Sequence, residues 1–332
     1  MKTLLLTEKE VKQLLSIDEV MEAVESAFKE KGLKRVQMPA KLYIFYEKYE
    51  GDLRVMPSYL EKKDISAVKV VNVHPNNPSK YGLPTVMATI ILVDPKNGAP
   101  LALMGGTWIT AMRTGAAGGV AAKYLARKDS KIIGLVGAGV QARTQLAALI
   151  CLYGELDEVK VYDINQSARE SYVSEVKNTY GGKIKNIFPV EEVKDAVKGA
   201  DIVVTTTPSR KPLVMNEWVE EGMHFNCIGA DAPGKEELDP SILRRSKIVV
   251  DDWEQASHSG EINVPLSRGL ITRENIWAEI GEVVAGLKEG RTRPDEITVF
   301  TSTGLAIQDA VTADITYRKA LEKGVGRTLE LV

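Results

Sequence analysis

The spacing of apolar residues predicts two parts of the chain with different folds. Between Thr7 and Lys31, apolar residues recur at every third or fourth position, which predicts one or two amphipathic helices. Short apolar or alternating runs then predict strands at 40–46, 52–56, 65–74, 85–93 and 101–104. The last two runs flank an Asp-Pro-Lys-Asn-Gly turn and are expected to form a hairpin. A helix rich in alanine and glycine is expected at 108–125.

After residue 131 the pattern changes to a regular alternation of strand-like and helix-like segments. Strands are expected near 131–136, 158–163, 184–188, 201–206, 224–229, 247–251 and 296–300. Helices are expected between most of them, and this alternation is typical of a doubly wound, mainly parallel α/β sheet. A last helix is predicted from Gly304 to about Lys323.

A glycine-rich turn identifies the kind of α/β domain. Gly137-x-Gly139-x-x-Ala142 follows the first apolar run, and the second run ends at Asp163, roughly 20 residues further on. The first glycine permits a sharp turn, the second lets the backbone approach a pyrophosphate, and the small third residue lets the helix pack on the strand. The N–H groups of the helix N-terminus attract the phosphates. The sequence therefore predicts a dinucleotide-binding Rossmann domain.

The acidic residue at the end of the second run indicates which dinucleotide binds. A carboxylate at Asp163 can accept hydrogen bonds from both ribose hydroxyls and would repel a 2′-phosphate. The following residues, Ile164, Asn165 and Gln166, include no arginine to hold such a phosphate. NAD is therefore favoured over NADP.

Length and charge are consistent with two soluble domains and exclude some partners. The chain has 332 residues, 44% of them hydrophobic, and a formal net charge of −2 at pH 7. We expect neither a nucleic-acid partner nor a membrane. The apolar run Leu4-Leu-Leu6 is too short for a signal peptide, and we expect a cytoplasmic protein. The two cysteines, Cys151 and Cys227, lie in apolar segments and are expected to be buried free thiols.

Lys69 is the first candidate for chemistry. It lies in a run whose alternation places it on the same face as the apolar residues Ile65, Ala67, Val71 and Val73. If that face is buried, loss of water would lower the pKa of the lysine and suit it to proton transfer. An exposed lysine on a solvated face fits this strand equally well.

Other charged residues are weaker candidates on their own. Asp231 follows a predicted central strand at the edge where open α/β sheets bind ligands, although a turn aspartate is an equal alternative. Arg113, among small residues, is suited to hold a carboxylate or phosphate. Lys41 and Arg54 lie on or near predicted strands, where surface charges are commoner. Ser302 follows the last predicted strand. The three histidines have no metal-ligand spacing, so no metal is expected.

Longer motifs spread along the chain carry a resemblance. They include Met56-Pro-Ser-Tyr59, Thr110-Ala-Met-Arg-Thr-Gly-Ala-Ala117 and Ile228-Gly-Ala-Asp231, and further stretches at 68–78, 82–87, 136–145 and 302–309. Over nearly its whole length the chain resembles the ornithine cyclodeaminase/μ-crystallin family. Within that family it is most similar to the archaeal-type alanine dehydrogenases, also through 205–212 and 260–264.

The resemblance implies a domain division and residue roles. Residues 1–115 with the C-terminal segment 304–332 would form an α+β domain for substrate binding and homodimerisation, and 116–303 the NAD-binding domain. Lys69 and Asp231 match the catalytic residues of the family, and Arg113, with Lys41, matches its carboxylate-binding cations. The implied cofactor contacts are Arg113, Thr114, Gly137, Gly139, Val140, Gln141, Asp163, Ile164, Asn165, Thr206, Gly229, Ala230 and Ser302.

The resemblance also implies a reaction, the NAD-dependent interconversion of L-alanine with pyruvate and ammonium. Ornithine cyclodeaminases carry an acid two positions before the Met-Pro pair, whereas this chain has Arg54. A cation there would repel the distal ammonium of ornithine and attract a carboxylate, which favours a short amino acid. Reduction of a cyclic imine, such as a ketimine or pyrroline-2-carboxylate, and ornithine cyclodeamination remain alternatives. A nucleotide-dependent binding protein of the μ-crystallin type is an alternative from another class.

Overall fold

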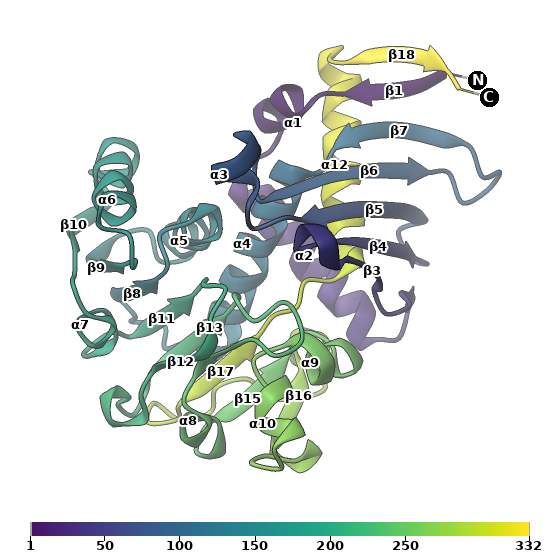
Figure 1. Ribbon diagram of the computed structural model, residues 1–332. Helices are drawn as coiled ribbons and strands as arrows, with labels where there is room; N and C mark the ends of the chain where they lie inside the picture. The colour runs from purple at the N-terminus through teal and green to yellow at the C-terminus, as the bar shows by residue number, and fades with distance from the viewer. Residues whose placement is uncertain (1, 332) are drawn as a thin grey trace. The chain divides into compact units, whose positions relative to one another are not determined.

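The computed structural model describes residues 2–331 and divides into two compact units (Figure 1). Unit 1 contains the residues up to Arg113 together with those from Leu305 onward, and unit 2 is Thr114–Gly304. Helix α4 (Thr107–Leu125) begins in unit 1 and continues into unit 2. Within residues 2–331, we find no helix with the length and apolar character needed to span a bilayer.

Unit 1 is built on one mainly antiparallel sheet with the strand order β18-β1-β7-β6-β5-β4-β2, and β3 pairs with β4. Its strands are β1 (Lys2–Leu6), β2 (Val36–Gln37), β3 (Leu42–Tyr46), β4 (Gly51–Leu60), β5 (Ile65–Val73), β6 (Val86–Val93), β7 (Pro100–Gly105) and β18 (Arg327–Glu330). Its helices are α1 (Glu8–Leu14), α2 (Ile17–Gly32), α3 (Asn77–Tyr81) and α12 (Ala306–Lys323), with the 3₁₀ turn η1 (Glu47–Tyr49).

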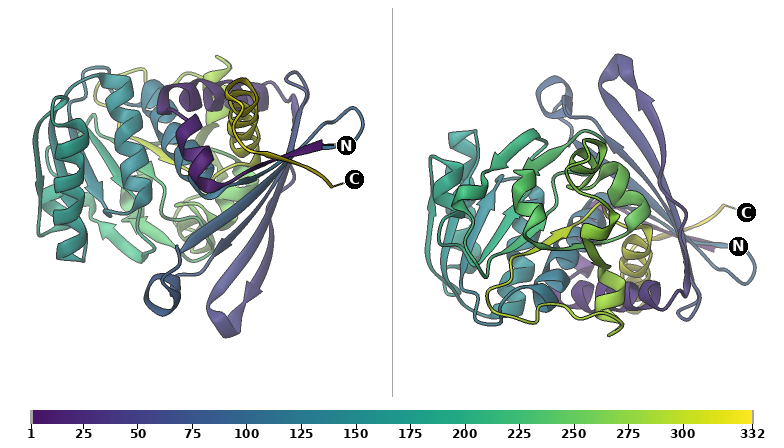
Figure 2. Two further views of the ribbon diagram at one scale, coloured as in Figure 1. Left: turned by 90° about the horizontal axis from the view of Figure 1, so that it is seen from above. Right: turned by 90° about the horizontal axis from the view of Figure 1, so that it is seen from below.

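Helix α12 covers the inner face of this sheet. It packs against β4, β5 and β6 and against α2, and Figure 2 shows α2 and α12 on the same side of the sheet. Because side chains alternate along a strand, every second residue of β4 and β5 points at this helix layer. Met56, Val71 and Ala306 form a buried apolar cluster there. The alternation therefore aims Lys69 and Arg54 inward as well.

Unit 2 is a doubly wound sheet whose strands are all parallel, in the order β10-β9-β8-β11-β13-β17-β15-β16. These strands are β8 (Ile132–Val136), β9 (Leu156–Tyr162), β10 (Ile184–Pro189), β11 (Ile202–Thr205), β13 (His224–Cys227), β15 (Lys247–Val250), β16 (Ile276–Glu279) and β17 (Thr298–Thr301). A separate parallel pair is formed by β12 (Arg210–Val214) and β14 (Glu236–Leu238). The predicted α/β class with a Rossmann-type sheet is confirmed.

Helices cover this sheet, and two apolar clusters fill the space between layers. The helices are α5 (Val140–Tyr153), α6 (Gln166–Tyr180), α7 (Val193–Val197), α8 (Pro240–Arg244), α9 (Trp253–Ser259), α10 (Asn263–Ser267) and α11 (Ile280–Val284), with the 3₁₀ turns η2 (Asn216–Trp218) and η3 (Arg273–Asn275). The strand order reverses direction beside β8, because β9 and β11 flank it. In this fold class, ligands bind at the carboxyl ends of strands at such a reversal.

The structure adds a strand at the start of the chain and corrects one expectation about a cysteine. The apolar start of the chain, which we compared with a signal peptide, is an inner strand, β1, between β18 and β7. The prediction that both cysteines are buried is wrong for Cys151, which is exposed, whereas Cys227 is buried. Cys151 lies near the end of α5, and an apolar run within a helix does not reveal which of its residues face outward.

Candidate functional site

The glycine turn between β8 and α5 has the geometry of a dinucleotide site. Gly137 has φ = +104°, a conformation that favours glycine, and a Cβ there would lie 2.7 Å from Thr206 Oγ1. A Cβ on Gly139 would have no heavy atom within 4 Å, so the space beside this backbone is open. Helix α5 begins at Val140, directly after Gly139. The first turn of α5 therefore offers unpaired N–H groups beside an open space, which fits a pyrophosphate.

Asp163 lies at the end of β9 and faces this turn. Its Oδ2 accepts a hydrogen bond of 2.8 Å from the backbone N–H of Ala138, and its Oδ1 accepts one of 2.9 Å from Asn165. The carboxylate is therefore held beside the glycine loop, as a ribose-binding acid requires. Ile164 is 91% exposed, and Asn165 caps helix α6 by accepting a hydrogen bond from Ser167.

Five more of the predicted residues of unit 2 follow three neighbouring strands. β11, β13 and β17 end in register at Thr205, Cys227 and Thr301. Because parallel strands end at the same edge of a sheet, the loops after them lie together there. These loops carry Thr206, Gly229, Ala230, Asp231 and Ser302.

Buried or partly buried acids organise these loops. Asp231 forms an ion pair of 2.6 Å with Lys235, four residues further along the sequence. Asp251, fully buried after β15, accepts hydrogen bonds from the backbone N–H groups of Thr303 and Gly304, at 2.6 and 2.8 Å. It thereby fixes the loop that begins with Ser302.

Unit 1 contains a buried charged network built around Lys69. The side chain of Lys69 is fully buried, and its Nζ lies 2.7 Å from Asp309 Oδ2. Arg113, also buried, places its Nε 3.0 Å from Asp309 Oδ1 and donates from Nη1 to Gln308 Oε1 at 3.0 Å. β5, α4 and α12 thus bring together a lysine, an arginine and one aspartate. The structure selects the buried alternative for Lys69 over the exposed one.

Burial changes the proton affinity of this lysine. Loss of water lowers the pKa of Lys69 to about 7, and the positive charge of Arg113 acts in the same direction. Asp309 opposes both effects, and Lys41 adds a further lowering contribution. A lysine with a pKa near neutrality can both take and give a proton at physiological pH, which suits general acid–base chemistry.

The remaining predicted cations of unit 1 are placed differently. Arg54 is buried on the inner face of β4, and its Nε and Nη2 bind Asp52 Oδ1 and Oδ2 at 2.9 and 3.0 Å. Its guanidinium also lies over the ring of Tyr43. Asp52 therefore occupies one edge of this guanidinium. Lys41 is half-buried just before β3, close enough to influence the pKa of Lys69.

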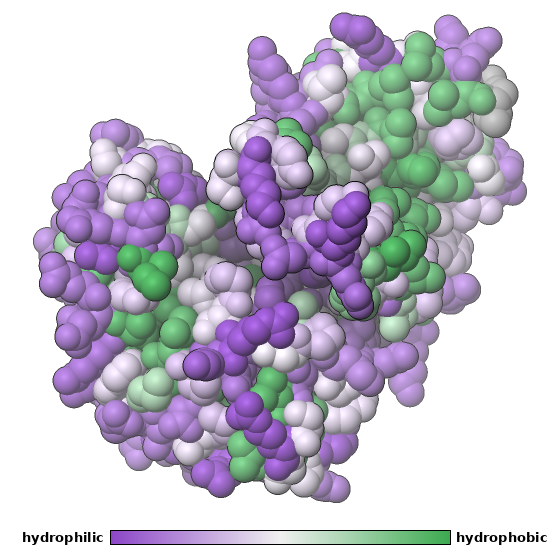
Figure 3. Space-filling view, viewed as in Figure 1, coloured by the Kyte–Doolittle hydropathy of each residue, from purple (hydrophilic) through white to green (hydrophobic). Residues whose placement is uncertain are grey.

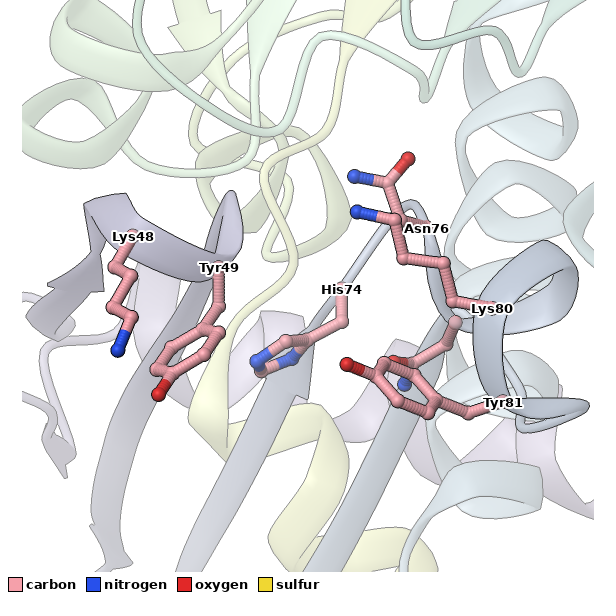
Figure 4. A pocket seen from close by; sticks show the side chains of 7 residues that line it. Lys48, Tyr49, His74, Asn76, Lys80 and Tyr81 are labelled. Carbon is pink, nitrogen blue, oxygen red and sulfur yellow. The ribbon is translucent and has the colours of Figure 1, made fainter.

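A separate pocket of about 240 Å³ opens at one end of the unit 1 sheet (Figure 4). Its labelled lining residues, from η1, the end of β5 and α3, are Lys48, Tyr49, His74, Asn76, Lys80 and Tyr81. None of the residues predicted for the site lines it. Within the described part of the chain, no group of three or more His, Cys, Asp or Glu is placed to hold a metal ion.

Sequence reasoning assigned no role to the acids that hold the cations. Asp309 lies in the largely apolar stretch Ala306-Ile-Gln-Asp-Ala-Val311 of the predicted last helix. An acid among apolar helix residues was the signal in the sequence that could have indicated a buried partner for a cation. Asp52 is two residues before Arg54 on the same strand, so it shares a face with Arg54 by strand alternation.

Unit 2 is a Rossmann sheet with a dinucleotide turn, and unit 1 contains a buried lysine with a pKa near neutrality. This combination is typical of nucleotide-dependent enzymes. Residues 1–324 match the model of the ornithine cyclodeaminase/mu-crystallin family. The chain is 53% identical to alanine dehydrogenase from Archaeoglobus fulgidus over 330 residues, 99% of each chain. The chain belongs to the ornithine cyclodeaminase/mu-crystallin family.

The solved structures similar to nearly the whole chain include the two described next. An archaeal alanine dehydrogenase dimer with bound NAD has a TM-score of 0.94 and 52% identity, with 100% of both chains covered. Thermococcus litoralis Δ¹-pyrroline-2-carboxylate reductase, in complex with NADH and L-proline, has a TM-score of 0.95 and 47% identity. That match covers 98% of this chain and 100% of the reductase.

Proposed function

We propose that this protein catalyses the oxidative deamination of L-alanine to pyruvate and ammonium with NAD, and the reverse reductive amination, in the cytoplasm. The single observation that supports it most is the fully buried Lys69, paired with Asp309 and with a pKa near 7. The 53% identity of the chain to alanine dehydrogenase from Archaeoglobus fulgidus supports alanine as the substrate in this proposal.

The cofactor is NAD. The open space beside Gly139 and the placement of Asp163 against Ala138 fit an adenosine diphosphate with free ribose hydroxyls. The two similar structures carry NAD and NADH. We assign pyrophosphate binding to the turn that ends at Gln141, with Arg113 and Thr114, and ribose binding to Asp163. Exposed Ile164 would cover the adenine, and Thr206, Gly229, Ala230 and Ser302 would contact the nicotinamide end.

The substrate carboxylate would be bound by the cations of unit 1. Arg113 and Lys69 share one acid, Asp309. When Lys69 is protonated, the three groups together carry a net positive charge, which attracts an anion. Lys41 adds charge close to Lys69. Arg54 is oriented by its two hydrogen bonds to Asp52, which would fix the direction of its guanidinium.

Proton movements would be divided between Lys69 and Asp231. Bound NAD supplies the hydride acceptor. Neutral Lys69 would take a proton from the substrate ammonium, so that the nitrogen lone pair can stabilise the developing positive charge at Cα. Asp231 would remove a proton from the water that attacks this carbon, and protonated Lys69 would return its proton to the departing ammonia. Alanine, water and NAD⁺ thus give pyruvate, ammonium, NADH and one further proton.

A second function is favoured by one comparison, the 47% identity to a Δ¹-pyrroline-2-carboxylate reductase. A cyclic imine acid presents the same carboxylate beside a carbon that accepts hydride. The same cations would hold it, and Lys69 would protonate the imine nitrogen. The two substrates differ in ring closure and in the need for a base that activates water.

The substrate test compares four reactions under one set of conditions: NAD with L-alanine, NADP with L-alanine, NAD with L-ornithine, and NADH with Δ¹-pyrroline-2-carboxylate. We expect the highest kcat/KM with L-alanine and NAD. The alanine and imine reactions are followed through the absorbance of the reduced nucleotide, and the ornithine reaction, which yields no net NADH, through release of ammonium. A kcat/KM for the cyclic imine that greatly exceeds the value for alanine would move the function to imine reduction. Turnover of ornithine would contradict the interpretation of Arg54.

We further propose that the outer face of the unit 1 sheet binds a second copy of the chain. Apolar residues of this face are exposed or half-buried, and Figure 3 shows apolar side chains gathered over this sheet. The face consists of Leu42, Ile44, Leu53, Val55, Val68, Val70, Ile91 and Leu103. A contiguous apolar surface of this kind is typical of an obligate interface. The similar archaeal structure is a dimer.

Replacing Ile91 with lysine places a charge at the centre of this outer face, where Ile91 lies opposite Val68 and Leu103. We expect the mass in light scattering to fall from about two chains to one, because an unpaired charge is costly in an apolar interface. Leu287→Lys, at a 59% exposed position of unit 2, is the matched control and should leave the mass unchanged. A dimeric Ile91→Lys variant would place the interface elsewhere.

A further inference from the structure

Glu237 is a fully buried acid whose two oxygens receive four hydrogen bonds. Oε1 accepts from the backbone N–H of Thr207 at 2.7 Å and from its hydroxyl at 2.6 Å. Oε2 accepts from the hydroxyl of Thr205 at 2.7 Å and from the N–H of Gly229 at 3.0 Å. A buried carboxyl with this many donors is stabilised in its charged form, which opposes the cost of burial.

The four donors belong to three residues at or just beyond the ends of two adjacent strands. Thr205 ends β11, and Thr207 comes directly after Thr206. Gly229 lies two residues after the end of β13 and two before Asp231. Packing here is close: a Cβ on Gly229 would lie 2.1 Å from Thr207 O and 2.6 Å from Glu237 Oε2. The carboxyl group of Glu237 therefore links the loop after β11 to the loop after β13 through hydrogen bonds.

A second buried acid, Glu261, binds the backbone of the segment that carries Glu237. Glu261 Oε1 accepts hydrogen bonds from the backbone N–H groups of Glu237 and Leu238, at 2.8 and 2.7 Å. The N–H of Glu261 donates to the hydroxyl of Thr301, the last residue of β17. The other oxygen, Oε2, is buried without a hydrogen-bond partner among the described residues.

The two acids have different tendencies to hold a proton. Burial, followed by the charge of Glu237, raises the pKa of Glu261 well above its ordinary value. Burial also raises the pKa of Glu237, but the hydrogen bonds from Thr207 and Thr205 counteract it. Because Glu237 receives four donors and Glu261 two, the shared negative charge is favoured on Glu237 and the proton on Glu261.

We propose that Glu237 is a positioning residue for NAD: its carboxylate fixes the loops that carry Thr206 and Asp231, and so sets the shape of the nicotinamide end of the site. Glu237 touches neither substrate nor cofactor in this role. The inference rests on one part of the proposed function, the binding of NAD. It does not depend on whether the substrate is alanine or a cyclic imine.

The exchange of either acid for glutamine distinguishes their roles. Glu237→Gln offers one acceptor oxygen and one NH₂ group. In either orientation, the NH₂ faces a backbone N–H, of Thr207 or of Gly229, which loses its acceptor. Glu261→Gln keeps an oxygen for the N–H groups of Glu237 and Leu238, and its neutral NH₂ replaces a protonated oxygen. The first change should release a loop, and the second should not.

The experiment measures NADH binding by the full-length protein, through nucleotide fluorescence, together with thermal unfolding and the KM values for NAD and for the organic substrate. For Glu237→Gln, we expect NADH to bind about tenfold more weakly or worse, since a buried donor loses its partner and the loop that it held is released. The KM for NAD should rise more than the KM for the organic substrate. Glu261→Gln should bind NADH within about twofold of the parent protein.

Two results would overturn the proposal. One is a folded Glu237→Gln protein with the parent affinity for NADH. The other is an equal loss in both variants that follows their thermal stability, which would indicate a structural role alone. If Glu237→Gln does not fold, Thr205→Val removes one donor at nearly constant volume and should still weaken NADH binding severalfold. Because NADH binding needs no substrate, failure of the alanine assay leaves this test unaffected.

Discussion

Lys69→Ala is expected to lower kcat for alanine oxidation by about 10²–10⁴-fold, the usual contribution of a general acid–base group. In the parent protein, kcat/KM for oxidation should rise with pH through about 7, because Lys69 must be neutral to take a proton and burial lowers its pKa to about 7. In the direction of amination the dependence on Lys69 is reversed, since the lysine must then start protonated. The alanine variant should lose this ionisation in both directions.

Lys69→Arg is the matched control. It keeps the positive charge beside Asp309 but stays protonated at every accessible pH. If the role of Lys69 is proton transfer, the arginine variant should be as inactive as the alanine variant, with an NADH affinity near that of the parent. Retention of the ionisation near pH 7 in Lys69→Ala, or activity within tenfold of the parent, would assign proton transfer to another group.

Asp309→Asn is expected to cost about 3–5 kcal/mol of folding stability, the range for removing one partner from a buried ion pair. Asp309 is the acid between Lys69 and Arg113, and all three side chains are buried. Because Asp309 raises the pKa of Lys69, its loss should also move the kinetic ionisation to lower pH.

The stability loss should depend on pH with a definite sign. Lys69 has a lower pKa in the folded protein than its ordinary value of 10.5, so the folded state holds fewer protons than the unfolded state between about pH 7 and that value. The lysine therefore destabilises the fold most below pH 7, where it is charged. The cost of Asp309→Asn should accordingly be larger at pH 6 than at pH 9, as measured by urea unfolding.

Asp314→Asn supplies the control for this measurement, because it lies on the same helix. Asp314 forms a pair of 2.9 Å with Arg318; the arginine side chain is 64% exposed and that of Asp314 is 17% exposed, and burial raises the pKa of Asp314, so its charged form adds little to stability. Such a pair contributes little to stability, so this variant should change unfolding much less than Asp309→Asn at both pH values. Equal effects of the two substitutions would show that Asp309 is an ordinary helix residue rather than the counter-ion of the network.

Local patterns predicted the elements that position the site. The glycine turn, its flanking strands and Asp163 lie within 33 consecutive residues, 131–163, and their geometry follows from short-range requirements: a positive φ at Gly137 and open space beside Gly139. The placement of Lys69 on the same strand face as its apolar neighbours followed from alternation, whereas the burial of that face did not. The β6–β7 hairpin and the long helices were predictable for the same reason, since periodicity and turn residues act locally.

The partners of the charged residues could not be predicted in this way. Asp309 meets Lys69 although 240 positions separate them (309 − 69), and only the packing of α12 on β5 brings them together. Strand β1 was missed because it is stabilised by β7 and β18, from distant parts of the sequence. The exposed side of α5 at Cys151 depends on what packs against that helix.

By itself the sequence therefore determined the α/β class, the dinucleotide turn with its preference for NAD, and the placement of Lys69 on the apolar face of its strand, because each depends on neighbouring residues. The tertiary structure alone decided that Lys69 is dehydrated and paired with Asp309, and that Glu237 ties together the loops after β11 and β13. The physical reason is that pKa values and loop positions depend on burial and on through-space contacts. These arise only when segments far apart in the chain pack together.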